Sequence, residues 1–112
     1  MFGLGPKVPT IEAEDLKKAL DEKSDVVIID VRTPGEFSKG HIKGSINLPV
    51  SDVAANIEKT ISAKDKTIIL YCLSGSRSVF AVDMLVKLGY SNVFDLKSGL
   101  LAWRSKQYPL EN

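Results

Sequence analysis

The chain has 112 residues, a formal net charge of +1 and a single cysteine, and these properties exclude several classes of protein. A length of 112 residues corresponds to one domain. One cysteine forms no intramolecular disulfide. One cysteine and one histidine fall short of the about four ligands that a structural zinc site needs. We therefore expect neither a metal nor a cofactor.

The charge pattern argues against nucleic acid or a membrane as a partner. Charged residues make up 26% of the chain, the two signs nearly cancel, and no basic stripe is visible. No apolar run approaches the roughly 18 residues of a membrane span. Residues 1–6 lack the basic segment followed by an apolar segment that marks a secretory signal. We expect a cytoplasmic protein, in a reducing compartment where a lone thiol stays free.

The first part of the chain predicts a lead-in, a helix and a strand. Residues 1–9 hold two Gly and two Pro and predict an irregular segment ahead of one domain over residues 10–112. Thr10 is placed to cap a helix over about residues 11–22, whose apolar residues recur on one face. The run Val-Val-Ile-Ile at residues 26–29 is β-branched and continuous, which is typical of a strand buried on both faces.

The middle of the chain predicts turns, a short strand and a second helix. The Thr-Pro-Gly sequence at residues 33–35 and the segment 40–44 have the composition of loops. Residues 45–48 predict a short strand that Pro49 ends. Ser51 is placed to cap a helix that runs to about residue 61.

The last part of the chain predicts two strands and two helices. Residues 67–71 predict a second strand that is buried on both faces. Residues 79–88 predict an amphipathic helix that ends at Gly89. A short strand around residues 93–94 and a final helix over residues 99–105 complete the pattern.

Strands that alternate with helices predict an α/β domain with a mostly parallel sheet and helices on both faces. Sites in such folds lie at the carboxyl ends of the strands. Two strands end in unusual polar residues: Asp30 and Arg32 follow one, and Cys72 opens a polar loop after another. We expect these two groups to meet at the same edge of the sheet.

The loop after the strand at residues 67–71 is the strongest candidate for chemistry. Its small residues let the backbone curl around Gly75, so that N–H groups point inward and bind an anion. The start of the next helix and the Arg77 guanidinium add positive potential. Such surroundings lower the pKa of a thiol from about 8.5 and favour the nucleophilic thiolate of Cys72. The anion-binding residues are then Leu73, Ser74, Gly75, Ser76, Arg77 and Ser78.

A plainer interpretation of these residues stays open. Buried cysteines at strand ends are often inert core residues. The Ser-Gly-Ser-Arg-Ser sequence after Cys72 favours catalysis, because a core cysteine needs no anion-binding turn beside it. The serine hydroxyls either donate to a substrate or only suit a tight turn.

Three stretches of the sequence together resemble the rhodanese-like family. Residues 30–49, DVRTPGEFSKGHIKGSINLP, are similar to its D-V-R-x-x-x-E-[FY]-x-x-G-H-I-x-G-A-x-N-x-P signature, with Ser45 where Ala is usual. Residues 72–78, CLSGSRS, resemble its C-x-x-G-x-R-S loop. Residues 99–103, GLLAW, resemble its G-G-x-x-A-W element, with Ser98 in place of the first Gly. The resemblance extends over roughly residues 10–107.

The resemblance implies a five-stranded, mostly parallel sheet and a sulfurtransferase activity of the thiosulfate sulfurtransferase (rhodanese) type. Cys72 would take a sulfane sulfur from a small anionic donor such as thiosulfate and become a persulfide. It would then pass the sulfur to cyanide, to a cellular thiol or to a protein acceptor. Since an outside nucleophile takes the sulfur, a single cysteine is enough.

Other residues of the first motif are expected to support this site. Asp30 and Arg32 would form an ion pair or hydrogen bonds that brace nearby loops, and Glu36 would brace backbone or an arginine. We expect His41 to be structural, because an acidified thiolate needs no general base. Trp103 is expected to anchor the last helix.

Two alternatives to a sulfurtransferase stay open. The first is a binding module, either a persulfide carrier for a larger partner or a regulatory domain. The second is a Cys-dependent phosphatase or arsenate reductase on the same fold. Those enzymes have a C-x5-R loop, whereas four residues separate Cys72 from Arg77 here. The shorter loop encloses a smaller space, which suits a sulfur atom better than a tetrahedral oxyanion.

Overall fold

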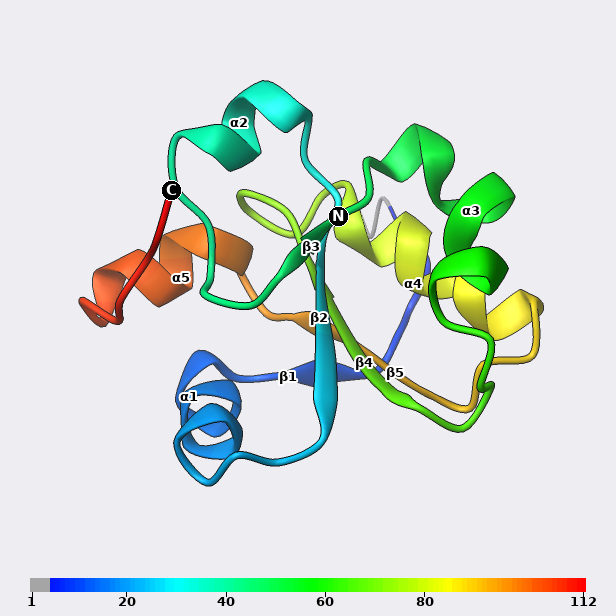
Figure 1. Cartoon of the computed structure of the whole chain (residues 1–112), viewed down its shortest axis with the longest axis horizontal. Coiled ribbons are helices and arrows are strands. Elements are labelled where there is room, and N and C mark those ends of the chain that lie inside the picture. Colours follow the sequence, from blue (N-terminus) through cyan, green and yellow to red (C-terminus); the bar gives the residue numbers. More distant parts are fainter. Residues whose placement is uncertain (1–4) are drawn as a thin grey trace.

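In the computed structural model, which describes residues 5–112, five parallel strands form one sheet with helices on both faces (Figure 1). The order across the sheet is β1-β5-β4-β2-β3. All neighbouring pairs are parallel. The architecture confirms the predicted α/β fold. The strands are β1 (Thr10–Ile11), β2 (Val26–Asp30), β3 (Ile46–Asn47), β4 (Thr67–Tyr71) and β5 (Asn92–Leu96).

The helices divide the hydrophobic core into two layers, one on each face of the sheet. One layer packs α1 and α5 against the sheet through residues such as Leu16 and Trp103. The other packs α3 and α4 through residues such as Ile57 and Leu85. The helices are α1 (Ala13–Asp21), α2 (Pro34–Ser38), α3 (Val53–Thr60), α4 (Ser78–Lys87) and α5 (Gly99–Ser105), with a 3₁₀ turn at Val50–Asp52. Among the residues from 5 onward, no helix is long and apolar enough to cross a bilayer.

The two strands predicted to be buried on both faces, β2 and β4, lie side by side in the middle of the sheet. Successive residues of β2 enter opposite layers: Ile28 packs with α1 and α5, and Ile29 packs with α3 and α4. Because both faces are covered, every position favours an apolar residue. This explains why the sequence runs are continuous rather than alternating.

The start of the chain differs from its prediction. Thr10 does not cap a helix, because Thr10 and Ile11 form the edge strand β1 and pair with Asp95 and Leu96 of β5. The helix begins only at Ala13. Hydrogen bonding to the edge of β5 outweighs the local capping preference of threonine. Residues 5–9 are neither helix nor strand, and residues 1–4 of the expected lead-in lie outside the described residues.

Two further local predictions are wrong. Ser51 caps no helix, because it lies inside the 3₁₀ turn that precedes α3. The segment at residues 33–35 is not a loop but the start of α2. There Thr33 Oγ1 accepts a hydrogen bond from the Glu36 N–H at 3.2 Å, and Glu36 Oε1 accepts one from the Thr33 N–H at 3.0 Å. This capping box, with Pro34 in the first turn, makes a five-residue helix from turn-like residues.

Candidate active site

The carboxyl ends of β2 and β4 lie next to each other, as the sequence indicates. Asp30 pairs with Tyr71 in the sheet register, and Cys72 follows Tyr71 directly. The loop from Cys72 to Arg77 then leads into α4 and lies between α2 and α5 (Figure 1). The Cys72 loop therefore has a helix on each side, α2 on one and α5 on the other.

The sulfur of Cys72 is surrounded by hydrogen-bond partners from its own loop. The Gly75 N–H donates to Sγ at 3.1 Å and the Ser78 N–H at 3.4 Å. The Ser78 hydroxyl lies 3.4 Å from the same sulfur. Gly75 has a φ of +107°, a conformation that glycine adopts without a steric penalty and that turns the loop inward. The backbone N–H groups of Gly75 and Ser78 thus both point at the sulfur.

Two opposing effects act on the thiol of Cys72. Burial raises its pKa, since only 1% of the residue is exposed. The hydrogen bond with the Ser78 hydroxyl and those from the N–H groups of Ser78, Arg77 and Gly75 lower its pKa. The hydrogen bonds outweigh burial, and the pKa of Cys72 falls below its usual value. The thiolate of Cys72 is therefore easier to form than that of an ordinary cysteine.

The Arg77 side chain pairs with Glu36 from α2. Its Nη1 lies 2.8 Å from Glu36 Oε1, and its Nη2 lies 3.0 Å from Oε2. The hydrogen bond from Arg77 and the one from Thr33 lower the pKa of Glu36 to about 2. Much of the guanidinium charge is therefore compensated by Glu36, and the ion pair ties the loop to α2.

Asp30 and Arg32 form a buried ion pair at the end of β2. Arg32 Nη2 lies 2.7 Å from Asp30 Oδ2, and the Arg32 N–H donates to Asp30 Oδ1 at 2.9 Å. Arg32 Nη2 also donates to the Gly40 carbonyl at 2.7 Å. Burial lowers the pKa of Arg32, but the hydrogen bonds and charge of Asp30 outweigh it, and the net pKa is raised. The pair braces the segment that carries α2.

The remaining predicted residues of the loop differ in their surroundings. Ser78 is fully buried, whereas Ser74 and Ser76 are exposed. The Leu73 carbonyl accepts a hydrogen bond from the Leu101 N–H at 3.0 Å, which joins the loop to α5. Of the three serines, only Ser78 is placed inside the protein next to the Cys72 sulfur.

Sequence reasoning missed one functional candidate, Asp95 on β5. Its side chain is buried, at 3% exposure, and accepts a hydrogen bond from the Ser78 hydroxyl. Burial raises the pKa of Asp95 to about 6, and the Ser78 hydrogen bond opposes that rise. The only signal in the sequence is an acidic residue inside the otherwise apolar run Val-Phe-Asp-Leu.

His41 and Trp103 have structural contacts. His41 stacks on Phe37 with ring centroids 3.6 Å apart, and its Nδ1 lies 2.8 Å from the Phe37 carbonyl oxygen. Trp103 is 1% exposed, and its Nε1 donates to the Pro109 carbonyl at 2.9 Å. These contacts agree with the structural roles expected for both residues.

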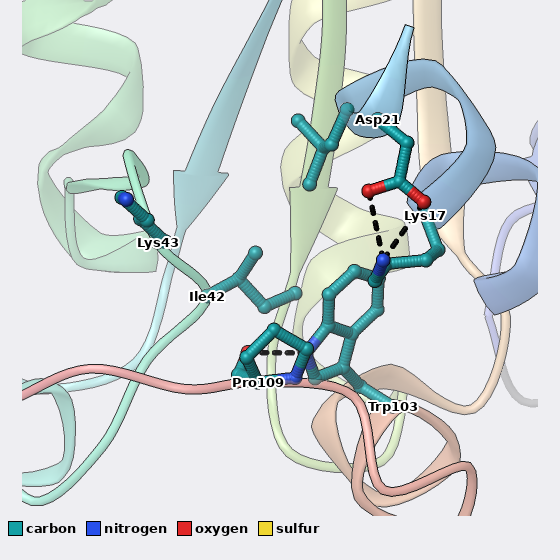
Figure 2. A pocket seen from close by; sticks show the side chains of 7 residues that line it. Lys17, Asp21, Ile42, Lys43, Trp103 and Pro109 are labelled. Carbon is teal, nitrogen blue, oxygen red and sulfur yellow. Dashed lines mark hydrogen bonds and ion pairs between the residues drawn. The ribbon is translucent and has the colours of Figure 1, made fainter.

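A cavity of about 350 Å³ lies apart from the Cys72 loop, between α1, the segment around Ile42 and the C-terminal residues (Figure 2). Figure 2 shows Trp103 and Pro109 closing one side of it, and Lys17 paired with Asp21 on another. No residue of the loop from Cys72 to Arg77 lines this cavity. The candidate site is the Cys72 loop, which places several N–H donors around a buried thiol. Within residues 5–112, no cluster of His, Cys, Asp and Glu is suited to hold a metal ion.

Comparisons with known proteins agree with one another over nearly the whole chain. The family model for the rhodanese-like domain matches residues 12–106. A sulfurtransferase from Allochromatium vinosum is 33% identical over 103 residues, which cover 92% of this chain and 94% of that protein. A putative mitochondrial thiosulfate sulfurtransferase from Schizosaccharomyces pombe is 37% identical over 101 residues, or 80% of this chain and 70% of that one. The solution NMR structure of a rhodanese-like domain from Anabaena has a TM-score of 0.85 at 29% identity and covers 95% of this chain and 80% of that one.

Proposed function

Because the chain belongs to the rhodanese-like family, we propose that it is a sulfurtransferase that carries sulfane sulfur as a persulfide on Cys72. The observation that carries the proposal is the set of donors around Sγ, from the Gly75 N–H and the Ser78 N–H, at the end of β4. A thiolate in that position is both stabilised and nucleophilic. The proposed donor is a small anion such as thiosulfate, as the name of the fission-yeast relative suggests.

In the first half-reaction, the Cys72 thiolate attacks the outer sulfur of thiosulfate. A bond forms between Sγ and that sulfur, the sulfur–sulfur bond within thiosulfate breaks, and sulfite leaves with the electron pair. Both reactants are anions, so the site must supply positive potential. The N–H groups of residues 73–78 and the start of α4 provide it without reorganising.

In the second half-reaction, the acceptor attacks the outer sulfur of the persulfide. Cyanide or a thiolate forms a bond to that sulfur, the bond to Cys72 Sγ breaks, and Cys72 leaves as the thiolate that began the cycle. The acceptor supplies the electron pair, so no second cysteine of this chain takes part. We propose that the reaction takes place in the cytoplasm, where a thiol acceptor is either a small molecule or a protein.

The remaining predicted residues have supporting roles in this proposal. Leu73, Ser74 and Ser76 shape the anion-binding turn. Arg77 and Glu36 hold the turn against α2. The buried pair of Asp30 and Arg32 fixes the neighbouring segment.

The experiment that tests the proposal measures thiocyanate formation from thiosulfate and cyanide. We expect turnover by the wild type, none by Cys72→Ser, and wild-type turnover by Ser51→Ala, a substitution at an exposed position in the 3₁₀ turn. Sulfur transfer to a thiol acceptor, without transfer to cyanide, would favour the persulfide carrier. Hydrolysis of a phosphate monoester that Cys72→Ser abolishes, with no thiocyanate formed, would contradict the proposal and favour a phosphatase.

A further inference from the structure

The sulfur-transfer steps leave one buried ionisable group unused, the carboxyl of Asp95. It lies on β5, 3% exposed, and accepts a hydrogen bond from the Ser78 hydroxyl. That hydroxyl also lies 3.4 Å from the Cys72 sulfur. Ser78 is itself fully buried. Cys72, Ser78 and Asp95 thus form a continuous hydrogen-bonded row that begins at the reacting atom and ends inside the sheet.

A serine hydroxyl has only one proton to donate. When the Ser78 hydroxyl donates its hydrogen bond to the Asp95 carboxylate, the Ser78 oxygen can only accept a hydrogen bond from the Cys72 thiol. When Asp95 is neutral, its own proton can point at the Ser78 oxygen, and the Ser78 proton is free to point at a Cys72 thiolate. The carboxylate and the thiolate therefore compete for the same hydrogen bond.

We propose that Asp95 is a positioning residue for sulfur transfer, because it competes with the Cys72 sulfur for the single hydroxyl proton of Ser78. The proposal rests on the sulfurtransferase function proposed above. An ionised Asp95 draws the Ser78 hydroxyl away from the sulfur, and a neutral Asp95 releases it. The persulfide of Cys72, which is also anionic, is subject to the same competition.

The other charged groups near this row have partners of their own among residues 5–112. Arg77, at the start of α4, pairs with Glu36 of α2. At the end of β2, Arg32 pairs with Asp30. After β5, Lys97 Nζ lies 3.6 Å from Glu12 Oε2. Within residues 5–112 no cation pairs with the Asp95 carboxyl, and the hydrogen bond from Ser78 is what connects it to Cys72.

The competition depends on pH in a defined direction. Burial raises the pKa of Asp95 to about 6, against the pull of the Ser78 hydrogen bond. Above that pH the carboxylate holds the Ser78 proton, and below it the proton is available to the thiolate. The backbone N–H groups of Gly75 and Ser78 do not titrate, so Asp95 modulates the thiolate rather than creating it.

The test follows the rate at which iodoacetamide alkylates Cys72 as a function of pH, because only the thiolate reacts. Asp95→Asn removes a buried negative charge and a strong competitor for the Ser78 proton. We therefore expect the midpoint of the rate profile to move to lower pH by at least about half a unit. A purely structural role for Asp95 gives the opposite sign, because a loosened loop loses its donors to sulfur.

A double-mutant cycle with Ser78→Ala isolates the path through the hydroxyl. We expect the midpoint shift caused by Asp95→Asn to shrink strongly in the Ser78→Ala background. In parallel, ¹³C NMR of the Asp95 carboxyl in Ser78→Ala alone should show a higher pKa than in the wild type. A midpoint that stays put or rises in Asp95→Asn, or a shift of the same size in both backgrounds, would overturn the proposal.

Alkylation needs no sulfur donor, so it separates this proposal from the sulfurtransferase function. A lowered midpoint in Asp95→Asn, with no sulfur taken up from thiosulfate by the wild type, supports the competition and overturns the proposed function. Sulfur uptake with an unmoved midpoint supports the proposed function and overturns the competition.

Discussion

Backbone donors, rather than a free side-chain cation, dominate the surroundings of the Cys72 sulfur. The sequence places Arg77 close to the thiol and predicts that its guanidinium supplies positive potential. The structure instead shows that guanidinium in a two-point ion pair with Glu36. The charge near the sulfur is thereby partly compensated, whereas the N–H group of Gly75 points at Sγ from 3.1 Å.

The ion pair between Glu36 and Arg77 makes a stability contribution that depends on pH. Glu36 has its pKa lowered from 4.5 to about 2, first by Arg77 and then by Thr33. A lowered pKa in the folded state stabilises the fold above pH 4.5, and that stability is lost as the pH falls toward 2. Because about a third of each side chain is exposed, we expect Glu36→Gln to cost about 1 kcal/mol at pH 7.

Urea unfolding of wild type and Glu36→Gln at pH 7 and at pH 3 measures this contribution. The difference in unfolding free energy should be largest at pH 7 and smaller at pH 3. Glu58→Gln is the control, since Glu58 is an exposed partner of Lys64 far along the chain. An equal difference at both pH values would show that the Glu36 charge does not stabilise the fold.

At the scale of elements, the Cys72 loop keeps its shape because α5 begins against it. The Leu100 N–H donates to the Cys72 carbonyl at 2.9 Å, and the Leu101 N–H donates to the Leu73 carbonyl at 3.0 Å. Gly99 makes this approach possible. A Cβ on Gly99 would lie 2.5 Å from the Cys72 carbonyl oxygen, and its φ is +56°.

Replacing Gly99 with alanine should therefore damage the site and the fold together. The methyl group has only rigid backbone to displace, so we expect Gly99→Ala to lower the unfolding free energy by about 2–4 kcal/mol. We also expect slower alkylation of Cys72, because α5 and the loop must separate. Gly35→Ala is the matched control, since a Cβ on Gly35 meets nothing within 4 Å. Wild-type stability and alkylation in Gly99→Ala would refute the close contact.

Most elements could be predicted from the sequence because their signals are local. Continuous apolar runs predict β2 and β4, Gly89 follows the end of α4, and Gly99 begins α5, as the pattern indicates. The helix cap predicted at Thr10 is wrong because strand pairing with β5, a partner more than 80 residues away, decides its conformation. Short polar segments allow several local structures, and tertiary contacts choose among them.

The same distinction applies to the candidate site. The Cys72 loop is continuous in sequence, so its composition alone indicates an anion-binding turn. Glu36 and Arg77 lie 41 positions apart, and Ser78 and Asp95 lie 17 apart. Nothing in the local pattern pairs them, and only the parallel order of β2, β4 and β5 brings these residues to one edge.

At the scale of the whole molecule, the C-terminal segment closes one face of the core. Trp103 donates to the Pro109 carbonyl, and the Tyr108 ring meets the Trp103 ring edge-on with centroids 5.0 Å apart. The backbones of His41 and Glu111 exchange hydrogen bonds of 2.8 Å. The last residues thus join α5 to the segment that follows α2.

Removing residues 108–112 should expose this face. Trp103 is the only tryptophan in the sequence, so all tryptophan fluorescence comes from this position. We expect the emission maximum to move to longer wavelength and the unfolding free energy to fall by about 2–4 kcal/mol, as burial of a large aromatic is lost. Removal of the exposed Asn112 alone is the control. Unchanged emission in the longer truncation would mean that the segment does not shield Trp103.

The most direct measurement of the proposed function is the intact mass of the protein after incubation with thiosulfate. The donors around the single thiol lead us to expect a gain of one sulfur atom in the wild type. A reductant should remove the added sulfur, and Cys72→Ala should show no gain. An unchanged wild-type mass, or the same gain in Cys72→Ala, would contradict a persulfide on Cys72.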